Sequence, residues 1–435
     1  MRYHIWTEGC QMNEADSEKL AAGLARLGWS EAARPEDADL AVVNTCVVRQ
    51  KAEDRAAAYL GRLRRLKEER NGRGPLQIAV MGCLVGPRTD DLRARFPYVD
   101  VWARPQAFEV ILRHLVPDSD LGGEFWPETF PEPKGPTAFV PVVHGCNKFC
   151  TYCIVPYRRG RERSRPIEDV AREVAAHCAR GVREVTLLGQ TVEAYGKDLE
   201  ERRDLADLFA AVHETPNLQR IRFLTSYPRD MTVRIVRAVA ELPKVCEHFN
   251  IPVQAADNDV LARMRRGYTI EEYVACVRRI RETVPAASLS TDVIVGFCGE
   301  TEAQFQRTLE LLAALRFDKV HVAAYSPRPG TIAWRHLEDD VPREEKMRRL
   351  HAVEALQERI ATEINEALAD TTQEVLVEGE KEGTLSGRTR ANKLVHWQGE
   401  AAPGELVRVR ITRTSPWALR GVRAEAGSPA GAVPA

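Results

Sequence analysis

The fold is decided by residues 146–153, which read Cys146-Asn147-Lys148-Phe149-Cys150-Thr151-Tyr152-Cys153. Three thiolates this close together on one loop can bind three corners of a cubane [4Fe–4S] cluster. No fourth cysteine lies nearby in the sequence, so the fourth iron would be left open. An open iron can bind the amino and carboxylate groups of methionine. The stretch therefore predicts a cluster with one position reserved for a ligand.

A structural zinc site is the alternative interpretation of this loop, because His144 would complete a Cys₃His ligand set. Zinc ligands usually come as a Cys-x₂-Cys pair with a distant second pair, whereas the spacings here are four and then three residues. The spacing favours the cluster, whose open iron would hold S-adenosylmethionine (SAM) and reduce its sulfonium to a 5′-deoxyadenosyl radical. The cofactor supplies this chemistry and the protein supplies positioning. Tyr152 is predicted to flank the adenine of SAM, and loop packing is its alternative role.

Six candidate strands alternate with amphipathic helices around and after the loop. They are predicted at Phe139–Val143, Glu184–Leu188, Arg220–Leu224, Phe249–Val253, Ser290–Val295 and Val320–Tyr325. This alternation favours a parallel (β/α)₆ partial barrel with its chemistry at the carboxyl ends of the strands. Four polar residues near those ends are predicted, as a group, to bind SAM: Gln190, Ser226, Gln254 and Asp292. Each of them could instead be a turn residue with a local hydrogen bond.

The first part of the chain repeats an apolar strand, a turn with a cysteine and a helix. The cysteines are Cys10, Cys46 and Cys83, and each follows a predicted strand. The repeat favours a doubly wound parallel sheet, in which the carboxyl ends of the strands meet at one edge. The three thiols therefore suggest a second cluster, although any lone cysteine is more often a buried apolar residue. That second interpretation is preferred for the remaining four cysteines: Cys178, Cys246, Cys276 and Cys298.

The C-terminal part favours a small β-barrel after a charged helix. In the strand around Val407–Ile411, alternation places Val407, Val409 and Ile411 on one face and two arginines on the other. Small barrels of this kind often bind oligonucleotides. The predicted domains are residues 1–117, a Pro/Gly-rich linker at 118–131, the partial barrel at 132–365, the small barrel at 366–427 and a disordered tail at 428–435.

Composition narrows the class of protein. The chain has 435 residues, too many for one core, and a formal net charge of −1, so contacts to nucleic acid must come from local basic patches. There is no signal-peptide pattern and no apolar run long enough to span a bilayer, which predicts a cytoplasmic protein. Ten cysteines in such a chain indicate metal or redox chemistry and not disulfides.

Two basic runs are candidate RNA contacts, because guanidinium groups grip phosphates. The first follows the cysteine loop and contains Arg158, Arg159, Arg161 and Arg163. A solvated loop with Glu162 as the partner is its alternative role. The second lies on the predicted small barrel and contains Arg388, Arg390, Lys393, Arg408 and Arg410.

Ordered motifs over nearly the whole chain resemble those of the methylthiotransferases, a radical SAM family. The N-terminal matches are Gly9-Cys10-Gln11-Met12-Asn13, Asn44-Thr45-Cys46 and Met81-Gly82-Cys83. Later matches include Ile154-Val155-Pro156-Tyr157, Leu187-Leu188-Gly189-Gln190, Met264-Arg265-Arg266-Gly267-Tyr268 and Thr291-Asp292. Gly387-Arg388-Thr389 with Asn392-Lys393 resembles the TRAM module of this family. The chain departs from the usual pattern at Thr191, Tyr227, Ala255–Asp257 and Cys298, which puts the finer substrate assignment in doubt.

The resemblance implies two [4Fe–4S] clusters, one on Cys146, Cys150 and Cys153 that binds SAM and an auxiliary one on Cys10, Cys46 and Cys83. The implied reaction adds a methylthio group to C2 of N6-isopentenyl (dimethylallyl) adenosine at position 37, beside the anticodon of tRNA. We expect a monomer that binds the anticodon stem-loop, receives electrons from a flavodoxin or ferredoxin, and uses a sulfur donor that the sequence does not name.

Three other functions stay open from the sequence. Two lie within the family: methylthiolation of threonylcarbamoyladenosine in tRNA, or of an aspartate on a ribosomal protein. The third is a non-catalytic iron–sulfur protein that binds RNA. The intact cysteine loop beside a complete set of barrel strands argues against the third, and the basic small barrel argues against a protein substrate.

Overall fold

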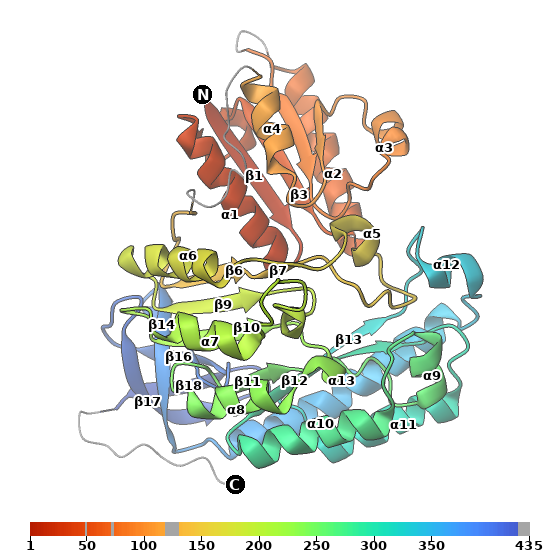
Figure 1. Ribbon diagram of the computed structural model, residues 1–435, viewed down its shortest axis with the longest axis vertical. Helices are drawn as coiled ribbons and strands as arrows, with labels where there is room; N and C mark the ends of the chain where they lie inside the picture. Colours follow the sequence, from red (N-terminus) through yellow and green to blue (C-terminus); the bar gives the residue numbers. More distant parts are fainter. Residues whose placement is uncertain (48–49, 71–73, 118–129, 425–435) are drawn as a thin grey trace. The chain divides into compact units, whose positions relative to one another are not determined.

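The computed structural model describes residues 1–47, 50–70, 74–117 and 130–424 of the 435. Its contacts divide the chain into two compact units (Figure 1). One contains Met1–Glu132 together with His144–Phe149 and Cys153–Arg163, and the other contains Pro133–Val143, Cys150–Tyr152 and Ser164–Ala435. Most of the predicted linker and all of the predicted tail lie outside the described residues. The predicted domain boundaries therefore stay predictions.

The N-terminal unit is built on a five-stranded parallel sheet in the order β2-β1-β3-β4-β5. Its strands are β1 (Arg2–Glu8), β2 (Ser30–Glu31), β3 (Leu40–Thr45), β4 (Gln77–Met81) and β5 (Val101–Ala103). Its helices are α1 (Gln11–Arg26), η1 (Pro35–Asp37), α2 (Gln50–Glu68), α3 (Asp90–Arg95), α4 (Phe108–Leu115) and α5 (Val155–Arg159). The predicted parallel sheet is confirmed.

Helices cover both faces of this sheet. Successive side chains along β3 point to opposite faces and are apolar on both, so both faces need a covering layer. Leu40 and Val42 join the apolar cluster that includes α1 and α4, whereas Ala41 and Val43 join the cluster that includes α2 (Figure 1). All six residues of β3 are buried. A strand buried on both faces is typical of a parallel sheet between two helix layers. The sheet is doubly wound, as predicted.

The second unit contains six parallel strands, in two sheets ordered β10-β9-β6 and β11-β12-β13. They are β6 (Thr137–Pro141), β9 (Glu184–Leu188), β10 (Arg220–Leu224), β11 (His248–Asn250), β12 (Ser288–Val295) and β13 (Lys319–Ala324). A parallel bridge between Ile221 and Val245 joins the two sheets beside β10. No pairing of β6 with β13 is found among the described residues. The predicted (β/α)₆ partial barrel is therefore confirmed.

Two predicted strand ends were wrong. The strand predicted at 139–143 ends at Pro141, and Val143–His144 forms a separate short strand, β7, which pairs with β8 (Arg163–Ser164). The strand predicted at 249–253 ends at Asn250, two residues before Pro252. Proline has no N–H to donate to a sheet ladder, so regular pairing stops near it.

Helices between the strands cover the outside of the partial barrel (Figure 1). They are α6 (Ile167–Ala179), η2 (Val192–Ala194), α7 (Leu205–His213), η3 (Pro228–Asp230), α8 (Val233–Glu241), α9 (Asn258–Arg263), α10 (Ile270–Thr283), α11 (Glu302–Leu315), α12 (Ile332–His336) and α13 (Arg343–Glu366). Capping boxes begin α10 at Thr269 and α11 at Thr301, where each threonine satisfies a free backbone N–H. Val185 and Leu187 of β9 pack under these helices in the apolar core, whereas Glu184 and Thr186 alternate with them.

The C-terminal strands close into a barrel in the order β14-β15-β16-β18-β17, as predicted. They are β14 (Thr372–Lys381), β15 (Thr384–Thr389), β16 (Leu394–Gln398), β17 (Leu406–Thr414) and β18 (Leu419–Arg423). Val407, Val409 and Ile411 point into its core, with exposed fractions of 4%, 0% and 0%. The alternation predicted for this strand is confirmed.

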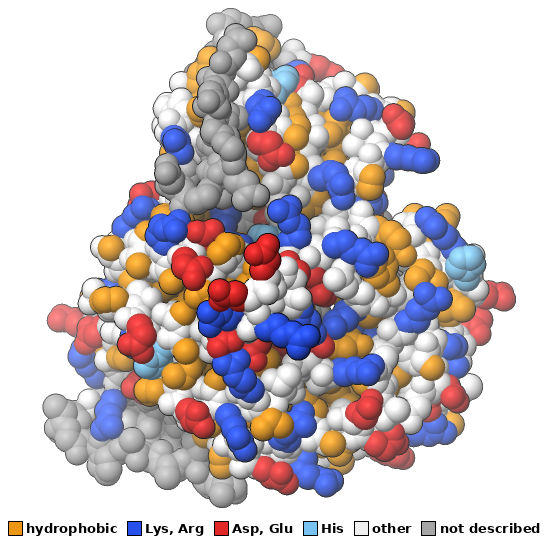
Figure 2. Space-filling view, in the orientation of Figure 1, with side chains coloured by type: hydrophobic (Ala, Val, Ile, Leu, Met, Phe, Trp, Pro, Cys, Tyr) orange, Lys and Arg blue, Asp and Glu red, His pale blue; other side chains and the backbone are white. Residues whose placement is uncertain are grey.

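On the face drawn in Figure 2, Lys and Arg side chains are interspersed with Asp and Glu, in keeping with the net charge of −1. None of the described helices is both long enough and apolar enough to cross a bilayer.

Candidate cluster-binding and RNA-binding sites

The loop that carries Cys146 is fixed by backbone contacts within the N-terminal unit. The Cys146 N–H donates to the carbonyl of Gly160 at 3.1 Å. Gly145 before it has φ +73°, and a Cβ there would lie 2.0 Å from the carbonyl oxygen of Arg161. Only glycine fits this left-handed, close-packed position. The two ends of the run from Gly145 to Arg161 are thereby held together.

The part of the loop around Cys150 is fixed within the second unit. The Thr151 hydroxyl donates to the carbonyl of Arg263 at 2.9 Å, and its N–H donates to that of Met264 at 3.0 Å. The Ala333 N–H in turn donates to the carbonyl of Thr151 at 2.8 Å. The backbone at Thr151, between Cys150 and Tyr152, is therefore fixed by hydrogen bonds to residues far along the chain.

A buried arginine faces the Cys150 sulfur. Arg266 is 6% exposed, and its Nη1 donates to Cys150 Sγ at 3.5 Å. Its guanidinium lies 4.9 Å from the ring centre of Tyr227 and 5.2 Å from that of Tyr268. The guanidinium thus places a positively charged N–H donor at the sulfur of one predicted cluster ligand. The departure at Tyr227 therefore has a structural role, since its ring packs on the arginine that contacts Cys150.

All ten cysteines are free thiols, including the six predicted ligands. Among the described residues, no three Cys, His, Asp or Glu side chains already meet at a point that would hold a single metal ion. A cubane does not require such a point, because each thiolate binds a separate iron at its own corner. Three soft thiolates, one of which has a guanidinium donor at its sulfur, are the ligand chemistry that this cluster takes.

The four predicted SAM-binding residues come from four neighbouring strands. Gln190 and Ser226 each follow the last residue of β9 and β10 by two positions, and Asp292 lies within β12. Gln254 bridges to Val293 with φ +68°, and its buried Oε1 has no hydrogen-bond partner. Asp292 accepts a hydrogen bond from Asn250 Nδ2 at 3.2 Å. All four lie toward the carboxyl ends of their strands, and their contacts to SAM stay a prediction.

Sequence reasoning missed a buried carboxyl at the same end of the barrel. Glu193 in η2 is 2% exposed, and its Oε2 accepts from the Tyr227 N–H at 3.1 Å. Burial raises the pKa of Glu193 to about 7, and the hydrogen bonds that it accepts only partly oppose the shift. An acidic side chain three residues after Gln190 was the available signal.

The ring of Tyr152 packs edge-on against Phe297, with 6.3 Å between ring centres. Loop packing, the alternative role for Tyr152, is therefore present in the structure. Phe297 also packs edge-on against Tyr325 at 5.0 Å. Cys298 beside it is 4% exposed, in agreement with its interpretation as a core residue, and Cys178, Cys246 and Cys276 are buried as well.

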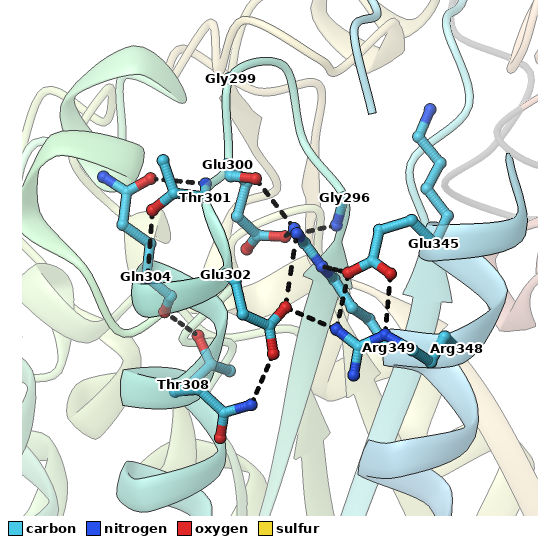
Figure 3. A network of polar contacts seen from close by, with 12 residues as sticks. Gly296, Gly299, Glu300, Thr301, Glu302, Gln304, Thr308, Glu345, Arg348 and Arg349 are labelled. Carbon is cyan, nitrogen blue, oxygen red and sulfur yellow. Dashed lines mark hydrogen bonds and ion pairs between the residues drawn. The ribbon is translucent and has the colours of Figure 1, made fainter. Parts of the chain in front are cut away.

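A network of charged side chains, of which Glu300 and Arg349 are buried, holds the turn that carries Phe297 (Figure 3). Glu300 accepts from the Gly296 N–H and pairs with Arg349 of α13 at 2.9 Å, and both side chains are at most 5% exposed. Glu345 pairs with both Arg348 and Arg349. A buried pair with all its partners in place fixes geometry more than it adds stability. Helix α13 thereby positions the end of β12.

The three N-terminal cysteines also lie where parallel strands end. Cys10 follows β1 by two residues, Cys46 follows β3 directly and Cys83 follows β4 by two residues. Asn13 and Asn44 link the turns, because Asn13 Nδ2 donates to Asn44 Oδ1 at 2.8 Å and Asn44 Nδ2 donates to the Asn13 carbonyl at 2.7 Å.

The Cys83 turn joins the same network through Gly82. Gly82 has φ +92°, and a Cβ there would lie 2.3 Å from Asn44 Oδ1. In the sequence these two asparagines and this glycine are recognisable only as parts of motifs. Their contacts show that the motif residues hold the three cysteine turns against one another.

One predicted RNA contact is wrong. Arg159 pairs with Asp16 at 2.9 Å, and both side chains are 1% exposed, so the guanidinium cannot reach a polynucleotide. Arg158 next to it is also partly enclosed, since its carbonyl accepts from Arg104 and its guanidinium fills the space above Gly86. Arg161 and Arg163 remain on the surface, and Arg161 lies over the ring of Phe149 at 4.8 Å.

Two residues of the second predicted patch attach the small barrel to the amino ends of the large one. Arg390 pairs with Glu247 at 2.6 Å and donates to the carbonyls of Pro243 and Val245, and Lys393 pairs with Asp318 at 2.6 Å. These partners occupy the charges that were predicted to bind phosphate. The predictions for Arg390 and Lys393 are therefore wrong, whereas Arg388 stays partly exposed beside Glu378.

The exposed basic face of the small barrel lies on β17 and β18. Arg408 and Arg410 are exposed, as predicted, and sequence reasoning missed three neighbours. These are Arg413, Arg420 and Trp417, of which Trp417 is 55% exposed. Arg413 pairs with Arg420 across β17 and β18 beyond a register shift after Ile411, and this shift breaks the alternation from which the two arginines could have been predicted. We call Arg408, Arg410, Arg413, Trp417 and Arg420 the barrel's basic face.

Three family models match the chain. Residues 140–312 match the radical SAM superfamily, residues 2–104 match the uncharacterized protein family UPF0004, and residues 370–422 match the TRAM domain. Among solved structures, the radical SAM methyltransferase TsrM from Kitasatospora setae is similar with a TM-score of 0.56 over 77% of this chain and 74% of that one. At 13% identity this likeness bears on the fold alone.

Close relatives extend over the full length. The chain is 47% identical over 424 residues to the tRNA-2-methylthio-N(6)-dimethylallyladenosine synthase of Dehalococcoides mccartyi strain CBDB1, covering 96% of this chain and 97% of the relative. It is 45% identical to the enzyme of the same name from Herpetosiphon aurantiacus, with 97% of both chains covered. The chain belongs to the tRNA-2-methylthio-N(6)-dimethylallyladenosine synthase family, within the radical SAM superfamily.

Proposed function

We propose that this chain adds a methylthio group to C2 of N6-dimethylallyladenosine in tRNA, at the adenosine next to the anticodon. The observation that supports this most directly is near-complete coverage, at 45–47% identity, of relatives that carry this activity in their names. The cofactors are SAM and two [4Fe–4S] clusters. The same coverage favours this substrate over threonylcarbamoyladenosine or a ribosomal protein.

In this proposal Cys146, Cys150 and Cys153 hold the cluster that binds SAM. That cluster, when bound, supplies one electron for reductive cleavage of SAM. Arg266 places a charged N–H donor at the Cys150 sulfur through its Nη1, and Thr151 keeps the loop backbone in place. Gly145 and the Gly160 carbonyl hold the other end of the loop. These contacts give the loop a fixed shape before any substrate binds, which is what a precise reaction geometry requires.

We assign SAM recognition to the carboxyl ends of β9 to β12. Gln254 offers a buried carbonyl oxygen with no partner in the protein, which suits a donor on the cofactor. Gln190, Ser226 and Asp292 provide further polar groups at neighbouring strand ends. Tyr152 and Phe297 present an aromatic pair beside the cysteine loop, and such rings pack well on a nucleobase.

We assign the auxiliary cluster to Cys10, Cys46 and Cys83. The Asn13–Asn44 contact and the Gly82 turn support this, because they hold three turns together that are otherwise far apart in sequence. Two thiols of the set, Cys46 and Cys83, are buried, and a buried thiolate without a metal or a cation would be costly.

For RNA we assign the exposed residues Arg161 and Arg163 and, separately, the barrel's basic face. Guanidinium groups bind phosphates in a sequence-independent way, and an exposed Trp417 offers a stacking surface for an unpaired base. The tRNA contact is proposed for the anticodon stem-loop, where unpaired bases can be splayed out. We also propose that the protein is a cytoplasmic monomer reduced by a flavodoxin or ferredoxin, because the cluster takes one electron at a time.

The test is mass spectrometry of tRNA nucleosides from a host that lacks its own enzyme. Expression of this chain should restore 2-methylthio-N6-dimethylallyladenosine, and the Cys150→Ala variant should not. The matched control is Cys246→Ala, which removes a buried thiol at the amino end of the barrel. Absence of the product with the unaltered chain, or its appearance on threonylcarbamoyladenosine alone, would overturn the proposal.

A further inference from the structure

A buried arginine lies among the thiols of the auxiliary site. Arg159 is the last residue of α5, the short helix that begins two residues after Cys153. Its Nη2 donates to Asp16 of α1 at 2.9 Å, and both side chains are 1% exposed. The remaining electrostatic neighbours of this guanidinium are the thiols of Cys83 and Cys10. The loop of one predicted cluster thus leads directly to a charge inside the other predicted site.

The hydrogen bonds of the Arg159 guanidinium to nitrogen and oxygen acceptors are incomplete, and the unused donor is Nη1. Among the described residues no nitrogen or oxygen atom accepts from the buried Nη1, although an arginine has five N–H groups to satisfy, and the Cys83 thiol is the hydrogen-bonding neighbour that remains. A buried donor without a partner costs about 1–3 kcal/mol, and more when it is charged. An ion pair present only for stability would not leave this donor unused.

The charges around the site add up to a positive environment. The Cys83 thiol interacts with the guanidinium groups of Arg159 and Arg158 and with the Asp16 carboxylate. Two cations and one carboxylate therefore act on this buried thiol. A buried thiolate needs such compensation, because an unpaired buried charge is strongly unfavourable. Asp16 alone would have the wrong sign, so its role is to orient the guanidinium.

We propose that Arg159 is a positioning residue for the auxiliary cluster: its Nη1 donates to the sulfur of Cys83, and its charge, oriented by Asp16, offsets the negative charge of the cluster and its thiolates. The inference rests on the proposed assignment of that cluster to Cys10, Cys46 and Cys83. It goes beyond the ligand set because it names a residue on the SAM-cluster loop as part of the auxiliary site.

The geometry of α5 supports this role. Ile154 joins the apolar cluster of the N-terminal unit, and Tyr157 packs against that cluster. Arg104 donates to the carbonyl of Arg158 at 3.1 Å. The helix is thus held against the N-terminal sheet by its neighbours as well as by the ion pair. Loss of Arg159 should leave α5 in place and remove mainly the charge.

The experiment isolates the auxiliary cluster in a variant with Cys146, Cys150 and Cys153 all changed to alanine. After anaerobic reconstitution this parent should hold about four irons per chain. Arg159→Gln, Arg159→Lys and Asp16→Asn are then made in the parent, with Arg65→Gln, at an exposed arginine of α2, as a matched control. Two properties are measured: the midpoint potential of the cluster and the rate of iron loss to a chelator.

Removing a positively charged donor makes reduction of the cluster harder, so Arg159→Gln should shift the midpoint potential to more negative values. The same variant should speed iron loss about tenfold, which is the effect of one charge-assisted hydrogen bond. Asp16→Asn keeps the cation and should shift the potential in the opposite direction. Arg159→Lys and Arg65→Gln should stay close to the parent. A purely structural ion pair predicts similar changes in Arg159→Gln and Asp16→Asn.

Two results overturn the inference. Arg159→Gln with an unchanged potential would show that the guanidinium does not act on the cluster, and shifts of the same sign in Arg159→Gln and Asp16→Asn would show only a loss of packing. A parent without iron would instead contradict the proposed auxiliary cluster itself. Should Arg159→Gln fail to fold, the other two variants decide the question. The inference then requires a more positive midpoint potential in Asp16→Asn and an unchanged midpoint potential in Arg159→Lys.

Discussion

The two ends of the partial barrel use polar residues in opposite ways. At the amino ends of the strands, Arg222 donates to Glu184 and to the carbonyls of Thr389 and Arg390, all between 2.7 and 2.9 Å. At the carboxyl ends, Gln254 Oε1 is buried without a partner and the pKa of Glu193 is raised by burial. Charges at the amino ends are used in ion pairs and hydrogen bonds that attach the small barrel, whereas a carboxyl with a raised pKa and a buried amide oxygen mark the end where the cofactor is expected. Stability and chemistry are therefore separated along the strands, and mutations at the two ends should have different effects.

The largest expected effect is at the carboxyl end. Cys150→Ala should abolish SAM cleavage, because a cluster without one of its three thiolates is not held with its open iron toward SAM. The melting temperature of the protein without iron should change little, since the removed group is a single sulfur atom. Cleavage of SAM is measured by chromatography of 5′-deoxyadenosine. Cleavage at the rate of the unaltered protein would contradict the assignment of this loop.

The amino end should show the reverse pattern. Arg222→Met leaves the buried Glu184 with only the longer ion pair to Arg220, at 3.9 Å, and breaking a buried pair typically costs about 3–5 kcal/mol. We expect a lower urea midpoint with iron content and SAM cleavage retained in the folded fraction. The matched control is Arg234→Met, whose ion pairs with Asp204 and Asp207 lie on the surface and contribute little. Equal midpoints for the two variants would remove the proposed difference between the ends.

This separation also explains what could be predicted from the sequence. The cysteine loop is local, so its spacing alone indicates a cluster. Cys10, Cys46 and Cys83 are far apart, but a general rule of parallel sheets brings strand ends together, so their position was predictable as well. The apolar alternation at Val407, Val409 and Ile411 is equally local, and the structure agrees with it.

The predicted RNA contacts that the structure does not support, and the buried carboxyl that was missed, have one physical cause. Arg159, Arg390 and Lys393 looked like RNA contacts because a sequence shows a charge but not its partner. Asp16 and Glu247, which pair with the two arginines, each lie 143 residues away in the sequence. Glu193 was missed for the same reason, since its raised pKa arises from burial and not from any local motif.

Glu193 gives a pH test of the carboxyl end. Its pKa of about 7 in the folded protein is above the usual value of 4.5, so the folded state binds the proton more tightly than the unfolded state. Stability is therefore lost as the pH rises from about 4.5 through 7, by up to ~3 kcal/mol. Glu193→Gln keeps an oxygen for the Tyr227 N–H and removes the charge.

This variant should be more stable than the unaltered protein at pH 8 and nearly equal to it at pH 4.5, as measured by urea unfolding at both pH values. The same difference at both pH values would show that the carboxyl does not titrate in this range. The surface variant Glu344→Gln, on the exposed first turn of α13, serves as the control and should show no such dependence on pH.

The smallest effect is expected on the barrel's basic face, away from both ends. Arg408→Gln with Arg410→Gln should weaken binding of an anticodon stem-loop RNA severalfold and lower the slope of log affinity against log salt by about one for each phosphate that the protein no longer neutralises. Fluorescence anisotropy at several salt concentrations measures both quantities. Arg343→Gln, an exposed arginine at the start of α13, is the control. An unchanged slope would show that RNA does not use this face. Because Arg390 and Lys393 are already paired with Glu247 and Asp318, their removal should change stability while leaving the salt slope as it was.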